Sequence, residues 1–222
     1  MNRALIGRLI LKDWYLSRVP LTLIAIGGTL STVLLYQGGE AAGMAGLISA
    51  LISLIFLSIL IPQLTVVNER KQANLAFVMS LPISPAEYTM SKVLGNLSAF
   101  GLLWTAIAGA VLGTISLAPG TGGVIPLAVI AALAPFVSFC LLLAVAIVTE
   151  SELLAMVTMG ATNVAYSFWW FLFRLPGFGE DLKSPVPVWS DLVLTIIGGQ
   201  ITVIVAALAL TFYFQSRKRS FV

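Results

Sequence analysis

The sequence predicts an all-α integral membrane protein with six transmembrane helices. Of its 222 residues, 59% are hydrophobic and only 9% are charged, and the mean hydropathy is +1.03. A soluble domain carries about 25% charged residues, so this chain has too few charges to cover a surface that faces water. Its apolar runs also match the roughly 20 residues that a helix needs to cross about 30 Å of hydrocarbon.

Six runs meet this length requirement. We expect spans at about 19–36, 43–67, 93–117, 124–148, 153–173 and 192–214. Backbone groups in lipid must be hydrogen-bonded within their own segment, so each span is a helix. No second polar domain interrupts the pattern, so residues 1–222 form a single membrane domain. The long outer loop 174–191 contains prolines that prevent it from being one regular helix.

Lysine and arginine predict the orientation of the spans, because cytoplasmic loops carry an excess of both. One predicted side carries Arg3, Arg8, Lys12, Arg18, Arg70, Lys71, Lys92, Arg217, Lys218 and Arg219, and the other carries Arg174 and Lys183. This imbalance places both termini in the cytoplasm of a multi-pass protein of the cell membrane. Because the basic residues lie at the ends of apolar runs, the net charge of +3 does not indicate a nucleic-acid partner.

The segment before the first span, residues 1–18, is interpreted as an N-terminal interfacial or elbow segment. Ile6, Ile10 and Trp14 form an apolar stripe at helical spacing, and long basic side chains beside it can reach the headgroups. The alternative is a cytoplasmic extension of the first span, and the pattern does not decide between the two.

A polar stretch within the 68–92 loop predicts a new helix start. Ser84 and Glu87 have the spacing of a capping box, in which each side chain accepts a hydrogen bond from the other residue's backbone N–H. Pro85 then occupies the first helical position, where its missing N–H costs nothing. We expect this helix to continue into the third span, with Lys92 marking where it enters the headgroups.

Upstream of this start, residues 72–80 predict a short helix parallel to the membrane. It carries the apolar residues Leu75, Phe77, Val78 and Met79, and the pair Leu81–Pro82 ends it, because the residue before a proline avoids the α region. Exposed apolar side chains in a cytoplasmic loop need a cover. Either a partner protein covers them, or they dock on the headgroups or on the bundle itself.

The run VVNERKQANLAFVMSLPISPAEYTMSKVLGNL, residues 66–97, resembles the signature loop of type-2 ABC exporter permeases. The matching features are the charged exit Glu69, Arg70 and Lys71, the short helix 72–80, the break Leu81–Pro82–Ile83–Ser84, and Lys92 entering the third span. The span count and the cytoplasmic termini agree with that family. The chain departs from it at Gln72–Ala73–Asn74, where many members have Gly and Thr or Ser.

The resemblance implies a function. Two permease chains, identical or similar, would form a substrate pathway across the lipid bilayer, and two copies of a separate ABC ATPase would bind ATP and Mg²⁺. The short helix would be a coupling helix seated in a groove of the ATPase. The resemblance assigns this coupling role to Glu69, Arg70, Lys71, Asn74, Leu75, Phe77, Val78, Met79, Leu81 and Pro82.

The sequence itself predicts no catalytic or metal site in this chain. It lacks the GxxxxGK[ST] motif that binds nucleotide phosphates, and the nearest match, PGTGG at 119–123, has no lysine. There is no histidine, and Cys140 is the single cysteine, so no haem or zinc ligand set is visible. We therefore expect no enzyme activity and no cofactor in this chain.

The predicted spans carry no charged residue at mid-depth, which argues against an ion-coupled transporter and favours an apolar or amphipathic substrate such as a drug, a lipid or a peptide. Asn163 and Gln200 are the uncharged polar candidates for a substrate cavity, and an interhelical hydrogen bond is the alternative for Asn163. Two other functions stay open: a haem-exporter-like subunit, and a membrane scaffold or assembly protein without transport.

Overall fold

The computed structural model describes residues 3–37, 39–71, 85–149, 151–168 and 178–217, all of them in helices, turns or irregular segments. The helices are α1 (Arg3–Tyr36), α2 (Glu40–Pro62), the π-helix η1 (Gln63–Val67), α3 (Asn68–Lys71), α5 (Pro85–Leu117), α6 (Val124–Thr149), α7 (Glu152–Ser167), α8 (Phe178–Asp181) and α9 (Asp191–Arg217). Within the described ranges there is no strand, which confirms the all-α class.

Five helices in this part of the chain are long and apolar enough to cross a membrane. They are α1, α2 with η1, α5, α6 and α9. The remaining predicted span, the fifth at 153–173, corresponds to α7, which has 16 residues. At about 1.5 Å per residue it covers roughly 24 Å, less than the hydrocarbon thickness of about 30 Å. The rest of that predicted span, 169–173, lies outside the described residues, so the six-span arrangement stays a prediction.

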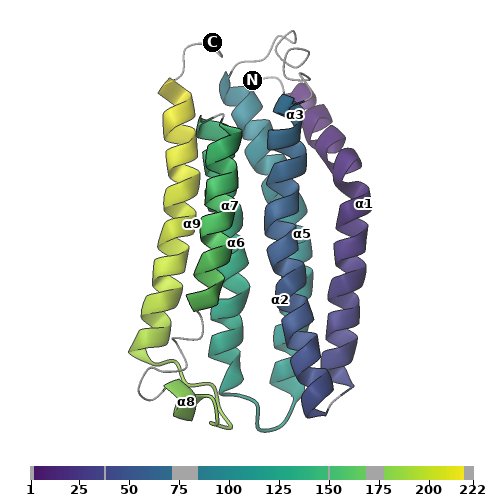
Figure 1. Ribbon diagram of the computed structural model, residues 1–222, viewed down its shortest axis with the longest axis vertical. Helices are drawn as coiled ribbons and strands as arrows, with labels where there is room; N and C mark the ends of the chain where they lie inside the picture. Colours follow the sequence, from purple (N-terminus) through teal and green to yellow (C-terminus); the bar gives the residue numbers. More distant parts are fainter. Residues whose placement is uncertain (1–2, 38, 72–84, 150, 169–177, 218–222) are drawn as a thin grey trace.

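The long helices run side by side, and their ends fall into two groups (Figure 1). The start of α1, the helix α3, the start of α5, the turn between α6 and α7 and the end of α9 lie at one end of the bundle, which we call the α3 end. The short helix α8 lies at the opposite end, the α8 end. Among the described residues, Arg3, Lys92 and Arg217 lie towards the α3 end and Lys183 lies at the α8 end, as the sequence grouping predicts, while the compartment that each end faces remains predicted.

Helix α6 is the centre of the bundle and packs on α2, α5, α7 and α9. It is apolar all round, as expected of a helix enclosed by other helices. Phe139 of α6 is fully buried and stacks on Phe100 of α5 with ring centroids 4.1 Å apart. Cys140 is fully buried beside it, in the same core cluster.

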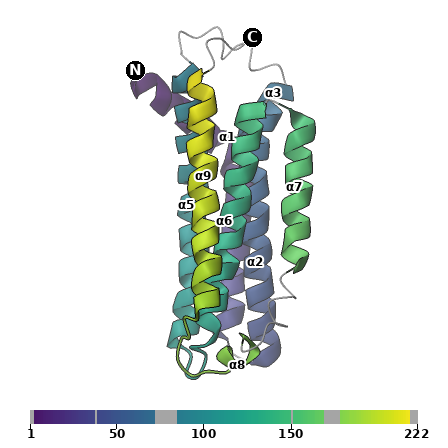
Figure 2. The ribbon, with the colours of Figure 1, turned by 90° about the vertical axis from the view of Figure 1, so that its left-hand side faces the viewer.

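The N-terminal segment is continuous with the helix of the first predicted span. Residues 3–36 form one continuous helix that passes through Pro20, and its first turns lean away from the bundle axis (Figure 2). Ile6, Leu9, Asp13 and Ser17 are buried along one side of this helix at the spacing of helical turns. The segment is therefore helical without a break from the first span, and Asp13 and Trp14 hold it against α5. Its position relative to the headgroups stays a prediction.

The connection between α6 and α7 is nearly as short as predicted, but its capping residue differs. Thr149 is the last residue of α6, where its hydroxyl donates to the carbonyl of Val145 at 2.8 Å. The side chain of Ser151 caps α7 instead, by accepting a hydrogen bond from the N–H of Leu154 at 3.3 Å. In the sequence, Thr149 and Glu152 have the spacing of a capping box, which predicts a cap two residues before the one that the structure shows.

At the α8 end, the turn before α6 packs tightly on the segment after α8. The N–H of Gly123 donates to the carbonyl of Ser184 at 2.9 Å. A Cβ atom at Gly123 would lie 2.2 Å from the carbonyl oxygen of Asp181, so this approach requires glycine.

Candidate functional site

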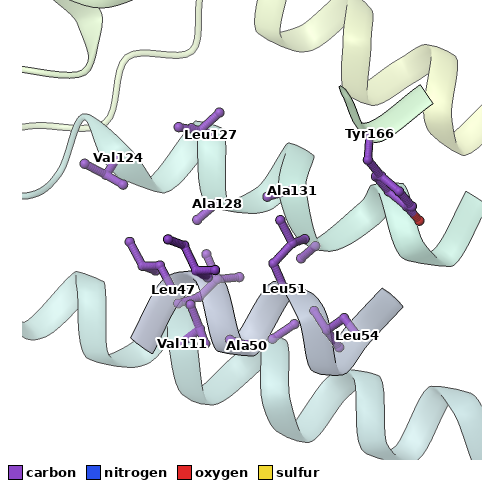
Figure 3. A pocket seen from close by; sticks show the side chains of 14 residues that line it. Leu47, Ala50, Leu51, Leu54, Val111, Val124, Leu127, Ala128, Ala131 and Tyr166 are labelled. Atoms are coloured by element: carbon purple, nitrogen blue, oxygen red, sulfur yellow. The ribbon is translucent and has the colours of Figure 1, made fainter. Parts of the chain in front are cut away.

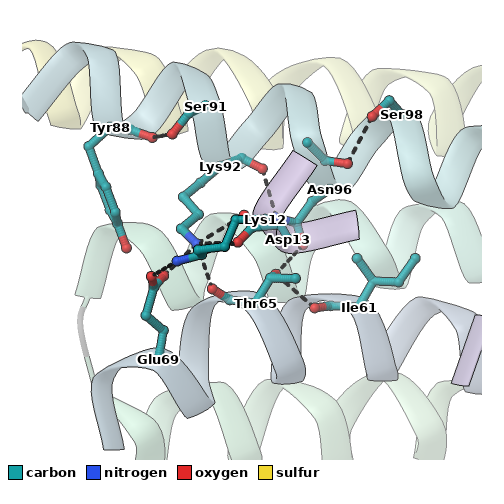
Figure 4. Close-up of polar contacts among 11 residues, drawn as sticks. Lys12, Asp13, Ile61, Thr65, Glu69, Tyr88, Ser91, Lys92, Asn96 and Ser98 are labelled. Carbon is teal, nitrogen blue, oxygen red and sulfur yellow. Dashed lines mark hydrogen bonds and ion pairs between the residues drawn. The ribbon is translucent and has the colours of Figure 1, made fainter. Parts of the chain in front are cut away.

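Four charged side chains meet at the α3 end of the bundle, and we call them the charge cluster: Lys12, Asp13, Glu69 and Lys92 (Figure 4). The first two come from α1, the third from α3 and the fourth from α5. Lys92 is 1% exposed, Asp13 3% and Glu69 7%. Charged side chains are almost never so deeply buried unless they are paired, and these four pair two cations with two anions.

Lys92 is the centre of the cluster. Its ammonium group donates to both carboxylate oxygens of Asp13, at 3.1 and 3.0 Å, and pairs with Oε2 of Glu69. Its third contact is the backbone carbonyl of Thr65, at 2.9 Å. An ammonium group has three donors, so this one side chain joins α1, η1, α3 and α5.

The backbone of η1 shapes this site. Pro62 has no N–H to donate to the preceding turn, and the π-helical stretch begins at the next residue, Gln63. The N–H of Asn68 then bonds the carbonyl of Gln63, a π-helical pairing. Single π-helical turns inside α-helices occur frequently at functional sites, and here the turn places the carbonyl of Thr65 beside the ammonium group of Lys92.

Polar side chains extend the cluster towards the middle of the bundle. The hydroxyl of Thr65 lies 2.6 Å from Oδ1 of Asn96, and the amide of Asn96 donates to the carbonyl of Lys92 at 2.7 Å. Both side chains are buried. They link η1 to α5 one turn deeper than the ion pairs, where a polar group without a partner would be costly.

The electrostatics of Glu69 follow from its neighbours. Burial on its own raises the pKa of this carboxyl group, but the ammonium groups of Lys92 and Lys12 outweigh burial and hold the pKa below its usual value of 4.5. Glu69 is therefore ionised at neutral pH. Lys12 approaches it from the solvent side and is 39% exposed.

The charge cluster brackets the predicted short helix, 72–80. Glu69 lies in α3, just before that segment, and Lys92 lies in the second turn of α5, just after it. The resemblance gives a coupling role to ten residues. The structure places three of them in α3: Glu69, which belongs to the charge cluster, and Arg70 and Lys71, of which the backbone is described. The others fall outside the described residues: Asn74, Leu75, Phe77, Val78, Met79, Leu81 and Pro82.

The start of the third span is partly described. Helix α5 begins at Pro85, as the sequence predicts, with Glu87 in its first turn, while Ser84 lies outside the described residues. Lys92 corrects one expectation. It was predicted to reach the headgroups, but it points into the bundle because Asp13 and Glu69 offer it buried partners.

The two predicted cavity residues lie apart. Asn163 is exposed on α7, and its amide donates to the carbonyl of Met159 in its own helix at 2.8 Å. Gln200 of α9 donates to the carbonyl of Ile130 in α6 at 3.1 Å. Gln200 thus makes an interhelical bond inside one chain.

Sequence reasoning missed the partners of Lys92. Asp13 had a usable signal, because it is an acidic residue in an otherwise basic segment that the orientation places at the same end as Glu69 and Lys92. Opposite charges on neighbouring helix ends predict an ion pair. Thr65 and Asn96 gave no such signal, since polar uncharged residues occur in many spans.

The cluster fixes helices and offers no open coordination site. Across the parts of the chain that the structure describes, no group of three or more His, Cys, Asp or Glu side chains could hold a metal ion. Comparison with known protein families, with curated proteins and with solved structures found no match. The resemblance to ABC permeases therefore rests on the quoted residues, and its consequences are proposals.

Proposed function

We propose that this chain is the membrane subunit of an ATP-driven exporter of the type-2 ABC class. In this proposal two such chains, identical or similar, enclose a pathway for an apolar or amphipathic substrate. A separate ATPase binds the segment 69–82 at the α3 end, and ATP with Mg²⁺ belongs to that partner. The loop sequence Leu81–Pro82–Ile83–Ser84 and the span pattern support the assignment.

The observation that carries the proposal is the buried contact between Glu69 and Lys92. A coupling helix works only if its displacement moves the spans on either side of it. Here α3, at the start of the segment, and α5, which follows it, are joined to each other by this ion pair, and Asp13 links them to α1. A push on the segment would therefore act on three helices together.

The charge balance of the cluster suits this role. An isolated buried charge would be expensive, and breaking one partner of a buried pair typically costs about 3–5 kcal/mol. The four side chains therefore move as a unit or not at all. Apolar packing alone would fix the positions of the helices less specifically than these ion pairs, because the hydrophobic attraction is not directional.

The test is a co-purification with a candidate ABC ATPase, sought among the genes that neighbour the one for this chain. Wild type, Phe77→Asp and Phe221→Asp are each expressed with the ATPase, extracted in detergent and assayed for co-elution and vanadate-sensitive ATP hydrolysis. The third variant is the matched control, since it places the same charge in the C-terminal tail. We expect wild type and the control to elute with two ATPase copies per two permease chains.

Phe77→Asp should elute without the ATPase while its bundle stays folded, because a carboxylate in an apolar groove lacks a partner. A wild-type chain that elutes alone would contradict the proposal and favour the scaffold function. Co-elution of Phe77→Asp at wild-type levels, with unchanged hydrolysis, would remove the coupling role from segment 69–82.

A further inference from the structure

The half of the bundle towards the α8 end contains a pocket between α2, α5 and α6, closed at one end by Tyr166 of α7 (Figure 3). Its volume is about 360 Å³, which lies within the range of roughly 300–1,000 Å³ that small-molecule pockets occupy. Neither Asn163 nor Gln200 is among the residues that line it.

The pocket exists because small side chains face one another. Five of its lining residues are alanines, contributed by all three long helices: Ala50, Ala108, Ala128, Ala131 and Ala132. Protein interiors are normally packed as densely as organic crystals. Where alanines of three helices meet, no side chain is long enough to fill the space between the backbones.

The chemistry of the wall excludes water as the occupant. The lining consists of aliphatic side chains and one tyrosine. The hydroxyl of Tyr166 is hydrogen-bonded to the hydroxyl of Ser138 at 2.7 Å. A stable buried water needs two to four polar partners, and this wall does not supply them.

The shape of the pocket runs along the helices. Its lining extends from Val124 to Ala132 on α6, which corresponds to about 12 Å at 1.5 Å per residue. One leaflet of the hydrocarbon core is about 15 Å thick, half of roughly 30 Å. An alkyl chain lying parallel to the helices within one leaflet therefore fits the length of the pocket.

The pocket also opens towards the exterior of the bundle. Ile48 of α2 belongs to its lining and is 57% exposed. Ile48 lies within a candidate span, Ala41–Val67, so its exposed face meets the hydrocarbon of the bilayer. The opening therefore faces the acyl chains of the bilayer lipids, which are present at high concentration there, and no water competes with them.

We propose that this pocket binds one acyl chain of a bilayer phospholipid, with the lipid headgroup remaining outside the protein. The wall offers contacts to methylene groups and no unpaired polar group to a headgroup. The bound chain would fill the space that the alanines leave and would hold α2, α5 and α6 at their separation. This inference does not depend on the exporter assignment, because it needs only a bilayer.

The test uses photo-labelling by a phosphatidylcholine that carries a diazirine on its acyl chain. The full chain is reconstituted in dioleoylphosphatidylcholine nanodiscs with this probe, irradiated, and mapped by mass spectrometry. Wild type should be labelled at the buried pocket residues Ala50 and Leu54 of α2 and within 124–132 of α6, as well as on outward faces such as those of Ile48 and α9. Ala128→Phe, which fills the pocket, should lose the first two labels and retain the third.

Ala106→Phe is the matched control, because Ala106 lies on the exposed face of α5; its labelling should equal that of wild type. Ala131→Leu is a milder filling variant in case the phenylalanine prevents folding, and monodisperse elution identifies folded samples. Pocket labels that persist in a folded filling variant would overturn the proposal. So would a wild-type protein labelled only on its outward faces.

Discussion

The two ends of the bundle are built in opposite ways. At the α3 end, charged and amide side chains from distant parts of the chain satisfy one another, and Lys92 is fully enclosed. At the α8 end, alanines leave an apolar pocket between α2, α5 and α6. The comparison suggests that directional contacts fix helix positions where a partner would act, while small side chains leave space where a ligand can enter.

Lys92→Met should have the largest effect. It removes the cation between Asp13 and Glu69 and leaves two buried carboxylates with the half-exposed Lys12 as their remaining cation among the described side chains. We expect the unfolding free energy to fall by about 3–5 kcal/mol, measured by denaturant unfolding in detergent micelles. Lys183→Met, at an exposed position near the α8 end, is the control, with an expected change within about 0.5 kcal/mol. Equal effects of the two variants would contradict the structural role of the cluster.

Alanine-to-leucine substitutions at two positions of α6 should have different effects on stability at the two ends of the bundle. Ala131→Leu adds volume next to the pocket and should leave the melting temperature unchanged or raise it. Ala146→Leu adds the same volume at a site that is 2% exposed and outside the pocket, and overpacking there should cost about 1–3 kcal/mol. The melting temperatures of both variants are measured in the same detergent. A larger loss of stability for Ala131→Leu than for Ala146→Leu would show that the pocket is already filled by protein.

Glu69→Gln should change the pH dependence of stability. The folded-state pKa of Glu69 is held below 4.5, so its contribution is fully present above pH 4.5, the value expected in the unfolded chain. The contribution is lost as the pH falls through the folded-state pKa, because protonation removes the attraction to Lys92 and Lys12. Asp13 of α1 also faces this group, and it is present in both proteins.

The measurement for Glu69→Gln is the melting temperature between pH 7 and pH 3. We expect the variant to be less stable than wild type at pH 7 and the difference to shrink as the pH falls below 4.5. A difference that stays constant over this range would mean that the ionised form of Glu69 does not stabilise the folded state.

Gln200→Leu should have the smallest effect. The substitution removes one hydrogen bond to the carbonyl of Ile130, worth about 0.5–1.5 kcal/mol. Unfolding in detergent measures this loss of stability. Asn163→Leu is the comparison, because the hydrogen bond that the structure describes for Asn163 lies within its own helix. If Gln200→Leu left stability unchanged and altered substrate binding, the cavity role predicted from the sequence would be favoured.

The sequence predicted the apolar helices well because span length is a local property. The predicted spans 124–148 and 192–214 correspond closely to α6 and α9. Local signals also located the start of α5 at Pro85. The first span was underestimated, since α1 extends through the charged segment that carries Asp13, where hydropathy falls.

The pairings at the α3 end could not be predicted in the same way. Asp13 and Lys92 are 79 residues apart, and Thr65 and Asn96 are 31 apart. Which faces of these helices meet depends on packing throughout the bundle, not on the sequence near either residue. For the same reason, the alanines of the pocket gave no signal until their helices were placed beside one another.

The most direct test of the central claim is a double-mutant cycle between Asp13 and Lys92. Unfolding free energies are measured in the same detergent for wild type, Asp13→Asn, Lys92→Met and the double variant. The claim that these side chains act as one unit predicts that the double variant loses less stability than the two single variants together, with an interaction energy of about 1–3 kcal/mol. Additive losses, within about 0.5 kcal/mol, would contradict it and would mean that α1 and α5 are held together by other contacts.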